Sequence, residues 1–376
     1  ALGTIEDFKK LVVDAKALGI DIAMDIAFQC APDHPYVKEH PDWFKQRPDG
    51  SIQYAENPPK KYQDIVNPDF GCDDAGALWN ALRDVILFWI DQGVKIFRVD
   101  NPHTKPFRFW EWLIHEVQLR HPDVIFLAEA FTRPKLMKGL AKLGFTQSYT
   151  YFTWRTQRWE LEQYLIELTS YPERDFYRPN FFVNTPDILP YHLQGGEVWM
   201  FKSRVALAAT LSSTYGIYNG FELLEHEPIP GREEYLDSEK YEIKVRDWDK
   251  PGNIKPYIRD LNLARRANPA LQQTGNLRFL GIEDSLVTGF VKESLDQTNT
   301  VAVAIALSRD VHDVWLPLGD VKVGPDRRPL LHLLPVHHEE GEVSTLMRCH
   351  RPRVVGCCGP KPGRIRAYGH CAPALS

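Results

Sequence analysis

Short apolar runs alternate with amphipathic stretches along most of this chain, and that alternation limits the folds open to it. The apolar runs have the length of buried strands, and the stretches between them carry apolar residues at helical spacing. The expected strands span residues 20–28, 94–99, 124–128, 145–150, 181–184 and 214–218. The expected helices span residues 5–18, 78–91, 107–120, 134–143, 159–168, 201–211 and 254–266. Strands that alternate with helices in this way indicate a parallel α/β architecture.

The start of the first helix carries a capping signal. Thr4 precedes the apolar positions and Asp7 follows three residues later, so each side chain is expected to bind the other residue's backbone amide. Gly19 then breaks the helical pattern. After the first strand, a long polar and Pro-rich excursion runs from residue 29 to about residue 74. We therefore expect an inserted loop or subdomain over residues 29–75.

Two parallel architectures fit this pattern, a doubly wound sheet and a (β/α)8 barrel. No glycine-rich phosphate loop follows an early strand, as a doubly wound nucleotide site would require. In a barrel, catalytic residues lie at the C-terminal ends of several strands, and Asp100, Glu129 and Asp187 each follow an expected strand. We predict a (β/α)8 TIM barrel over residues 1–271. Because six strand–helix units can be counted, the first two units are expected to be missing.

The pattern changes after the expected barrel. Residues 277–279, 285–291 and 300–307 read as strands without intervening helices, so 272–324 is predicted to begin a small C-terminal β-sandwich domain. Residues 325–376 are rich in Pro, Arg, His, Gly and Cys, and are predicted to be a disordered or out-of-frame tail. The spacing of its Cys and His residues fits no zinc pattern. We predict no metal and no cofactor.

Composition excludes some classes of partner. The net charge of −5 lacks the basic footprint of nucleic-acid or anionic-membrane binding. No apolar run approaches the roughly 18–20 residues that a membrane span needs. Two cysteines, Cys30 and Cys72, lie in the main body. Their scarcity is typical of a reduced, intracellular protein, and we expect a cytoplasmic location.

Three segments carry candidate chemistry. Arg98 and Asp100 share one face of a strand, so the cation is expected to keep the carboxylate ionised. Glu129 follows an apolar strand, where burial would raise its pKa as a general acid requires. Asp187 follows a turn at Pro186. Each also has a structural interpretation: an ion pair at a sheet rim, a helix cap and an ordinary turn. Together, two carboxylates meet the minimum for retaining glycosyl transfer, and a third can hold sugar hydroxyls.

Four segments resemble the four signature regions of the α-amylase clan. They are residues 25–30, 98–100, 129 and 184–187. By this resemblance Asp100 is the nucleophile, Glu129 the acid/base and Asp187 the transition-state stabiliser. The first region has Gln29-Cys30 where amylases carry Asn-His. The fourth has Thr-Pro where a His usually precedes the Asp, so a plain α-amylase is disfavoured.

Further segments are similar to one branch of that clan, the α-1,4-glucan:maltose-1-phosphate maltosyltransferases. They are residues 30–35, 47–50, 56–64 and 238–241, and the similarity covers about residues 1–310. It implies a maltose 1-phosphate donor, an α-1,4-glucan acceptor, released phosphate and a homodimer. It also implies substrate-binding roles near the donor for Gln29, Asn57, Lys60, Tyr62, Arg98, Asn101, Lys240 and Tyr241.

Physical chemistry agrees with a phosphate ester, because residues 57–62 supply two lysines, an amide and a phenol. A solvated polar loop would have the same composition. Two other functions stay open: another hydrolase or isomerase of the clan acting on α-glucans, and an inactive truncated fragment that folds poorly or only binds glucan. The leaving group separates the first two, because a transferase of this kind releases phosphate.

Overall fold

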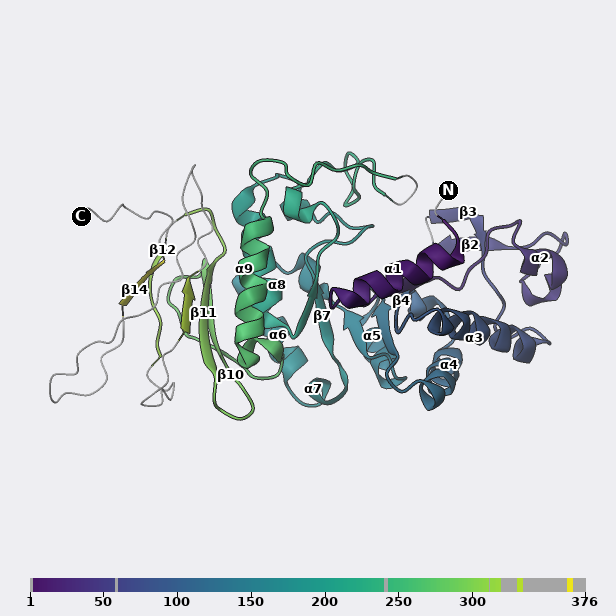
Figure 1. Cartoon of the computed structure of the whole chain (residues 1–376), viewed down its shortest axis with the longest axis horizontal. Coiled ribbons are helices and arrows are strands. Elements are labelled where there is room, and N and C mark those ends of the chain that lie inside the picture. The colour runs from purple at the N-terminus through teal and green to yellow at the C-terminus, as the bar shows by residue number, and fades with distance from the viewer. Residues whose placement is uncertain are drawn as a thin grey trace. The chain divides into compact units, whose positions relative to one another are not determined.

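The computed structural model describes residues 3–57, 60–239, 243–310, 312–318, 330–333 and 364–367 (Figure 1). The side chains of residues 57, 60, 313, 315, 330–333 and 364–367 are not part of that description. The chain divides into two compact units. The first comprises Ala1–Tyr149 and Phe176–Arg178, and the second comprises Thr150–Asp175 and Pro179–Ser376. Among the described helices, none is long and apolar enough to cross a membrane.

Parallel strands form the centre of the first unit, in the order β1-β4-β5-β6. Their bounds are β1 Ala23–Ile26, β4 Ile96–Asp100, β5 Ile125–Glu129 and β6 Gln147–Tyr149. The helices are α1 Ile5–Ala17, α2 Pro35–Glu39, α3 Ala75–Asp91, α4 Phe107–Arg120 and α5 Pro134–Lys142, with 3-10 turns η1 Pro41–Trp43 and η2 Pro102–Thr104. The predicted alternation of strands and helices is confirmed here, with small shifts at the ends of the elements.

Helix α1 begins as its sequence indicates. The Asp7 amide donates to Thr4 Oγ1 over 3.2 Å, and the Thr4 amide donates to Asp7 Oδ2 over 2.7 Å, which completes the capping box.

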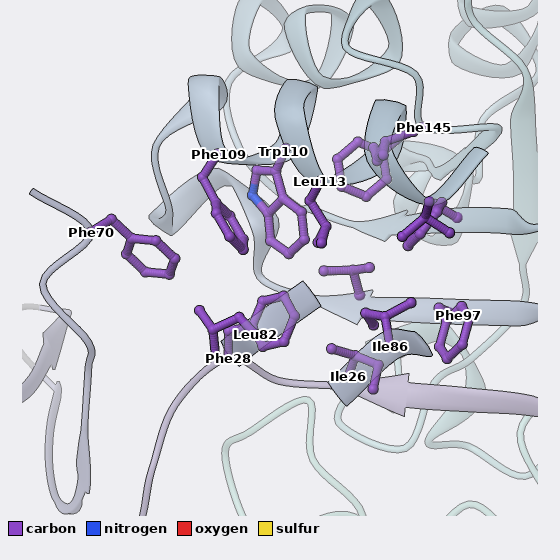
Figure 2. Packing of buried hydrophobic residues seen from close by; sticks show 14 of the residues in the cluster. Ile26, Phe28, Phe70, Leu82, Ile86, Phe97, Phe109, Trp110, Leu113 and Phe145 are labelled. Carbon is purple, nitrogen blue, oxygen red and sulfur yellow. The ribbon is translucent and has the colours of Figure 1, made fainter. Parts of the chain in front are cut away.

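The core beside the sheet is aromatic. The Phe28 ring stacks on Trp110 with centroids 5.6 Å apart and meets Phe109 edge-on (Figure 2). These rings fix α4 against the strand side of the unit.

The polar excursion contains secondary structure that the sequence pattern did not reveal. Strands β2 Tyr54–Asn57 and β3 Lys60–Val66 form an antiparallel hairpin. The backbone of Cys30 bonds to that of Val66 in both directions, which ties the hairpin to the segment after β1. The strands lack a regular alternation of apolar and polar residues, so period-two analysis could not find them. Their pairing comes from the backbone and from Val66, which is buried.

The second unit has parallel strands β7 Pro179–Phe182 and β8 Thr214–Gly216. Its helices are α6 Arg158–Thr169, α8 Val198–Leu211 and α9 Lys255–Ala267. Helix α7 Glu173–Phe176 spans the boundary in sequence, with Phe176 in the first unit. The 3-10 turns are η3 Tyr151–Trp154, η4 Tyr191–Leu193, η5 Phe221–Leu223 and η6 Pro269–Gln272. A sheet ordered β13-β11-β10-β9 follows, with β9 Leu277–Phe279, β10 Val287–Glu293, β11 Thr300–Ala306 and β13 Leu330–Leu333. Strand β12 His312–Trp315 pairs with β14 Arg364–Ala367.

The three predicted strands after residue 271 are therefore present as β9, β10 and β11. The domain boundaries at 271 and 324 stay predictions. Most of the predicted tail at 325–376 lies outside the described residues, apart from β13 and β14. The two body cysteines, Cys30 and Cys72, are free thiols.

Buried cations close the C-terminal end of α8. Lys292, which is fully buried, donates to the carbonyl oxygens of Thr210, Leu211 and Gln273. Arg265 donates to the carbonyls of Ala209, Ser212 and Ser213. Positive charge suits the last turn of a helix, where carbonyls lack intrahelical partners. Burial, with a smaller contribution from the nearby Arg265, nevertheless lowers the pKa of Lys292 to about 7.

This buried lysine predicts a pH dependence of stability. Between pH 7 and the ordinary lysine value of 10.5, the unfolded chain binds a proton that folded Lys292 has lost. The free energy of unfolding should therefore rise with pH across this window. Urea unfolding at pH 7 and pH 9 should show a larger rise for the wild type than for Lys292→Met. Equal rises in the two proteins would contradict the assignment, and Lys255→Met serves as the surface control.

Candidate active site

Two predicted catalytic carboxylates lie side by side in the first unit. Asp100 ends β4 and Glu129 ends β5, and the parallel register pairs these two residues directly. The same register pairs Asp25 of β1 with Arg98 of β4. Because parallel strands present their carboxyl ends at one edge of a sheet, the side chains converge there. The structure thus brings Asp100, Glu129 and Arg98 together at one edge of the sheet, while their roles in a site stay predictions.

Arg98 holds this cluster together. Its Nη1 lies 2.6 Å from Asp25 Oδ2 and 3.5 Å from Asp100 Oδ1, and its Nη2 lies 3.5 Å from Glu129 Oε1. Its guanidinium also stands 5.8 Å from the ring centroid of Tyr149, at the end of β6. Burial disfavours the charged form of Arg98, but Glu129 and Asp25 outweigh it and raise the pKa of this guanidinium above its ordinary value. A permanent cation thus faces three carboxylates.

The carboxylates differ in their exposure to water. The side chain of Glu129 is 9% exposed, that of Asp100 is 22% exposed and that of Asp25 is 60% exposed. Burial penalises the ionised form of a carboxyl group. Glu129 is therefore the least hydrated of the three carboxyl groups. The geometry sorts the pair into a candidate acid, Glu129, and a more hydrated candidate nucleophile, Asp100.

Asn101 links the two candidate catalytic carboxyl groups. Its Nδ2 donates to Asp100 Oδ1 over 3.0 Å, and its backbone amide donates to Glu129 Oε2 over 3.3 Å. The residue has φ 44° and ψ 50°, in the left-handed region. Asparagine tolerates this conformation better than other non-glycine residues. The positive φ turns the backbone amide toward Glu129 immediately after the strand ends.

The predicted donor-binding residues before β4 are described only in part. Gln29 lies three residues beyond β1 and is half-buried. Tyr62, also half-buried, pairs with Ala55 in the hairpin. Asn57 and Lys60 pair across the end of the same hairpin, but their side chains lie outside the described residues. Their phosphate role stays a prediction.

Asp187 belongs to the second unit, where local hydrogen bonds shape its turn. Its amide donates to Thr185 Oγ1 over 3.2 Å, and Thr185 and Ile188 bridge through their backbones. Just before the turn, fully buried Asn184 donates to the Tyr235 hydroxyl over 2.5 Å and accepts from the Tyr218 amide over 2.8 Å. The segment is thus a built turn rather than a solvated loop, although its catalytic role stays a prediction.

Lys240 and Tyr241 lie outside the described residues, but the chain on either side is anchored. Arg246 donates to Glu239 over 2.6 Å and to Glu225 over 2.8 Å, and its side chain is almost fully buried. The Tyr218 hydroxyl also donates to Glu239 over 2.8 Å. Burial works against the charge of Arg246, but its two glutamate partners raise its pKa above the ordinary value. This network holds Glu239 and Arg246 in place.

The structure adds residues that the sequence analysis did not propose for the site. Asp25 makes the shortest ion pair with Arg98, and the Arg98 guanidinium lies over the Tyr149 ring. Burial raises the pKa of Tyr149 to about 12. Their positions at the ends of β1 and β6 were the available signal, since the other site residues also lie at strand ends. The sequence around one residue does not show which strands pair, so these two residues could be placed beside Arg98 only once the strand register was known.

Comparison with solved structures identifies the fold of this chain. An α-amylase from Geobacillus thermoleovorans aligns with a TM-score of 0.69 at 16% identity, covering 85% of this chain and 73% of that one. A cyclomaltodextrinase aligns with a TM-score of 0.66 at 19% identity, covering 85% of this chain and 57% of that one. At such identities the likeness shows the fold alone. The chain has the α-amylase fold, so the predicted class of α/β barrel followed by an all-β region is confirmed.

Proteins similar in sequence narrow the relationship further than the fold does. The α-1,4-glucan:maltose-1-phosphate maltosyltransferase of Rhodospirillum rubrum is 55% identical over 333 residues, covering 88% of this chain and 48% of that protein. The enzyme of the same name from Methylacidiphilum infernorum is 55% identical over 328 residues, covering 87% and 49%. No family model matches the chain. The chain is thus a relative of these maltosyltransferases, as its motifs indicated, and it spans about half their length.

The left-handed conformation of Asn101 predicts a difference between two variants. Asn101→Ala and Asn101→Gly both remove the side-chain hydrogen bond to Asp100, but only alanine is strained at this φ. We expect Asn101→Ala to be less stable than Asn101→Gly by about 1 kcal/mol. Urea unfolding of the two variants measures this difference. Equal stabilities would mean that the backbone at residue 101 is not held in this conformation.

Proposed function

We propose that the chain carries the catalytic centre of a retaining glycosyltransferase that moves maltosyl units from maltose 1-phosphate to α-1,4-glucans and releases phosphate. The observation that carries the proposal is the cluster of Asp100 and Glu129 around Arg98, at adjacent strand ends. Relatives at 55–57% identity with this activity in their names supply the substrates. Because the chain spans about half of the first two of those proteins, the complete activity is part of the proposal.

Bond formation begins at Asp100 in the proposed mechanism. Its carboxylate attacks the anomeric carbon of the donor, and the bond from that carbon to the phosphate oxygen breaks. Glu129 gives its proton to the departing phosphate, and a maltosyl ester forms on Asp100. Glu129, now ionised, takes the proton from a glucan hydroxyl, which attacks the anomeric carbon and frees Asp100. Two inversions give overall retention of the α configuration.

Arg98 is a positioning residue in this scheme. Its contacts with both carboxyl groups keep them at fixed places through two changes of charge, so little reorganisation accompanies each step. Asn101 orients Asp100 through Nδ2. Asp187 is proposed to hold donor hydroxyls as the oxocarbenium-like state forms. Gln29, Asn57, Lys60 and Tyr62 are proposed to bind the phosphate, and Lys240 and Tyr241 the donor sugar.

The setting of the enzyme is also part of the proposal. We place it in the cytoplasm, which agrees with free Cys30 and Cys72, and we expect a homodimer from the resemblance to the maltosyltransferases. Transfer to glucan must compete with water, so acceptor binding is required for the second step. Hydrolysis or isomerisation would not need a phosphate-binding set of residues.

Phosphate release tests the reaction directly. With maltose 1-phosphate and maltohexaose, we expect phosphate to appear in step with glucan lengthening by two glucose units. Asp100→Ala should lower the rate by at least about a hundredfold, because it removes the nucleophile. A colorimetric phosphate assay and chromatography of the glucans measure both products. Release of glucose without lengthening would instead identify a hydrolase, and a variant close to wild type would remove Asp100 from the mechanism.

Lys60 provides a test of the donor group. Lys60→Ala is expected to reduce the rate with maltose 1-phosphate more than the rate with α-maltosyl fluoride, since fluoride needs no phosphate contact. The predicted difference between the two losses is about tenfold or more. Steady-state kinetics with both donors measure it, and Lys61→Ala is the matched control in the same strand. Equal losses with the two donors would argue against a phosphate role.

A further inference from the structure

A polar pocket of about 450 Å³ lies in the first unit, apart from the residues assigned above. Its walls come from three segments. They are the start of the hairpin at residues 53–56, the turn at residues 67–71, and residues 104–106, which follow η2; Lys45 completes the lining. This volume lies within the range of small-molecule sites, roughly 300–1,000 Å³.

Lys105 is the unusual group in this pocket. Its side chain is buried, with the residue 8% exposed, and its Nζ donates to Thr104 Oγ1 over 3.0 Å. Among the described residues no carboxylate lies within 4.0 Å of this ammonium group. An ammonium carries three donors and is costly to bury without acceptors. Burial accordingly lowers the pKa of Lys105, although Asp100 acts in the opposite direction.

A hydrogen-bond acceptor among the lining residues also lacks a partner. Asn67 Oδ1 is buried and has no hydrogen-bond partner among the described residues. It lines the pocket, as do the carboxylates of Glu56 and Asp69 and the rings of Tyr54 and Phe70. Asn67 Oδ1 is itself closed to solvent, so a bound group would accept from Lys105 and donate to the carboxylates of Glu56 and Asp69. A lining with both donors and acceptors favours a ligand with both capacities.

These demands distinguish a neutral polyol from an anion. Inorganic phosphate could accept from Lys105 and Lys45, but it would meet the negative charges of Glu56 and Asp69 and would have few donors for these carboxylates. A sugar ring carries hydroxyl groups that both donate and accept. The balanced charge of the lining and its mixed polarity favour the sugar.

The pocket is connected to the catalytic carboxylates through η2. The hydroxyl and the amide of Thr104 both bond to the carbonyl of Asn101, over 2.7 Å and 3.1 Å. The Trp110 indole donates to the Pro102 carbonyl over 2.8 Å and anchors the turn to α4. Thus the same short turn carries Asn101, which contacts Asp100 and Glu129, at one end and Lys105 at the other.

We propose that this pocket binds a glucosyl unit of the α-1,4-glucan acceptor, with Lys105 and Glu56 as its principal contacts. The inference rests on the proposed function for the identity of the glucan. It adds the location of an acceptor subsite, which neither the motifs nor the relatives' names supply. Lys105 donates to ring hydroxyl oxygens, Glu56 and Asp69 accept from hydroxyl hydrogens, and the glucan is held next to the turn that bears Asn101.

Binding of maltohexaose without any donor tests this assignment independently of turnover. Isothermal titration of the wild type is compared with Lys105→Met, Glu56→Gln and the control Lys95→Met, which removes a lysine beside the opposite end of β4. We expect Lys105→Met to weaken maltohexaose binding about tenfold, the loss of a charged hydrogen bond, and Lys95→Met to stay within about twofold. Glu56→Gln, at an exposed position, should weaken it about threefold and is informative even where Lys105→Met fails to fold.

Other outcomes overturn the assignment. Wild-type affinity for maltohexaose in both pocket variants would do so, as would no binding to the wild type. Inorganic phosphate titrated in parallel would identify an anion site if its affinity alone depended on Lys105. The phosphate-release assay stays separate: if maltohexaose binding depends on Lys105 but no phosphate is released, the proposed function fails and the glucan subsite stands.

Discussion

One half-buried guanidinium organises the carboxyl end of the parallel strands in the first unit. Arg98 contacts carboxyl groups from three neighbouring strands, β1, β4 and β5. These strands are parallel, so their last residues would otherwise place like charges beside each other. A permanent cation makes that arrangement tolerable, because each carboxylate gains an opposite charge at close range. Without it, burying Glu129 next to Asp100 would favour neutralising one or both.

The same cation explains how two similar carboxyl groups can differ in chemistry. Each contacts Arg98 at 3.5 Å, so the guanidinium does not by itself separate their roles. Their difference comes from hydration and from Asn101, whose side-chain amide serves Asp100 while its backbone amide serves Glu129. The αL conformation of one residue thus supplies a donor to each group. A nucleophile and an acid can arise from neighbouring strand ends in this way.

Much of this could be predicted from the sequence, for a physical reason. Barrel strands are buried and nearly continuous in apolar residues, so a carboxylate directly after such a run, as at Asp100 and Glu129, stands out. The hairpin at 54–66 did not stand out, since its residues are mostly polar and its pairing depends on the backbone. Asp25 lies in the first signature region, but its contact with Arg98, like that of Tyr149, depends on strand pairing, which single positions do not encode. A lone lysine after a turn, such as Lys105, has no distinguishing pattern at all.

The partners of the buried cations separate structural roles from functional ones. Lys292 is surrounded by backbone carbonyls at the end of α8, and these can neither titrate nor leave, so the arrangement serves the fold. Arg98 is surrounded by carboxyl groups that can gain and lose protons, which is what proton transfer requires. Lys105 has a single hydroxyl partner among the described residues and lines a pocket. Burial costs each cation a comparable loss of hydration, so a buried cation whose protein partners are too few is the one whose remaining partner is best sought in a ligand.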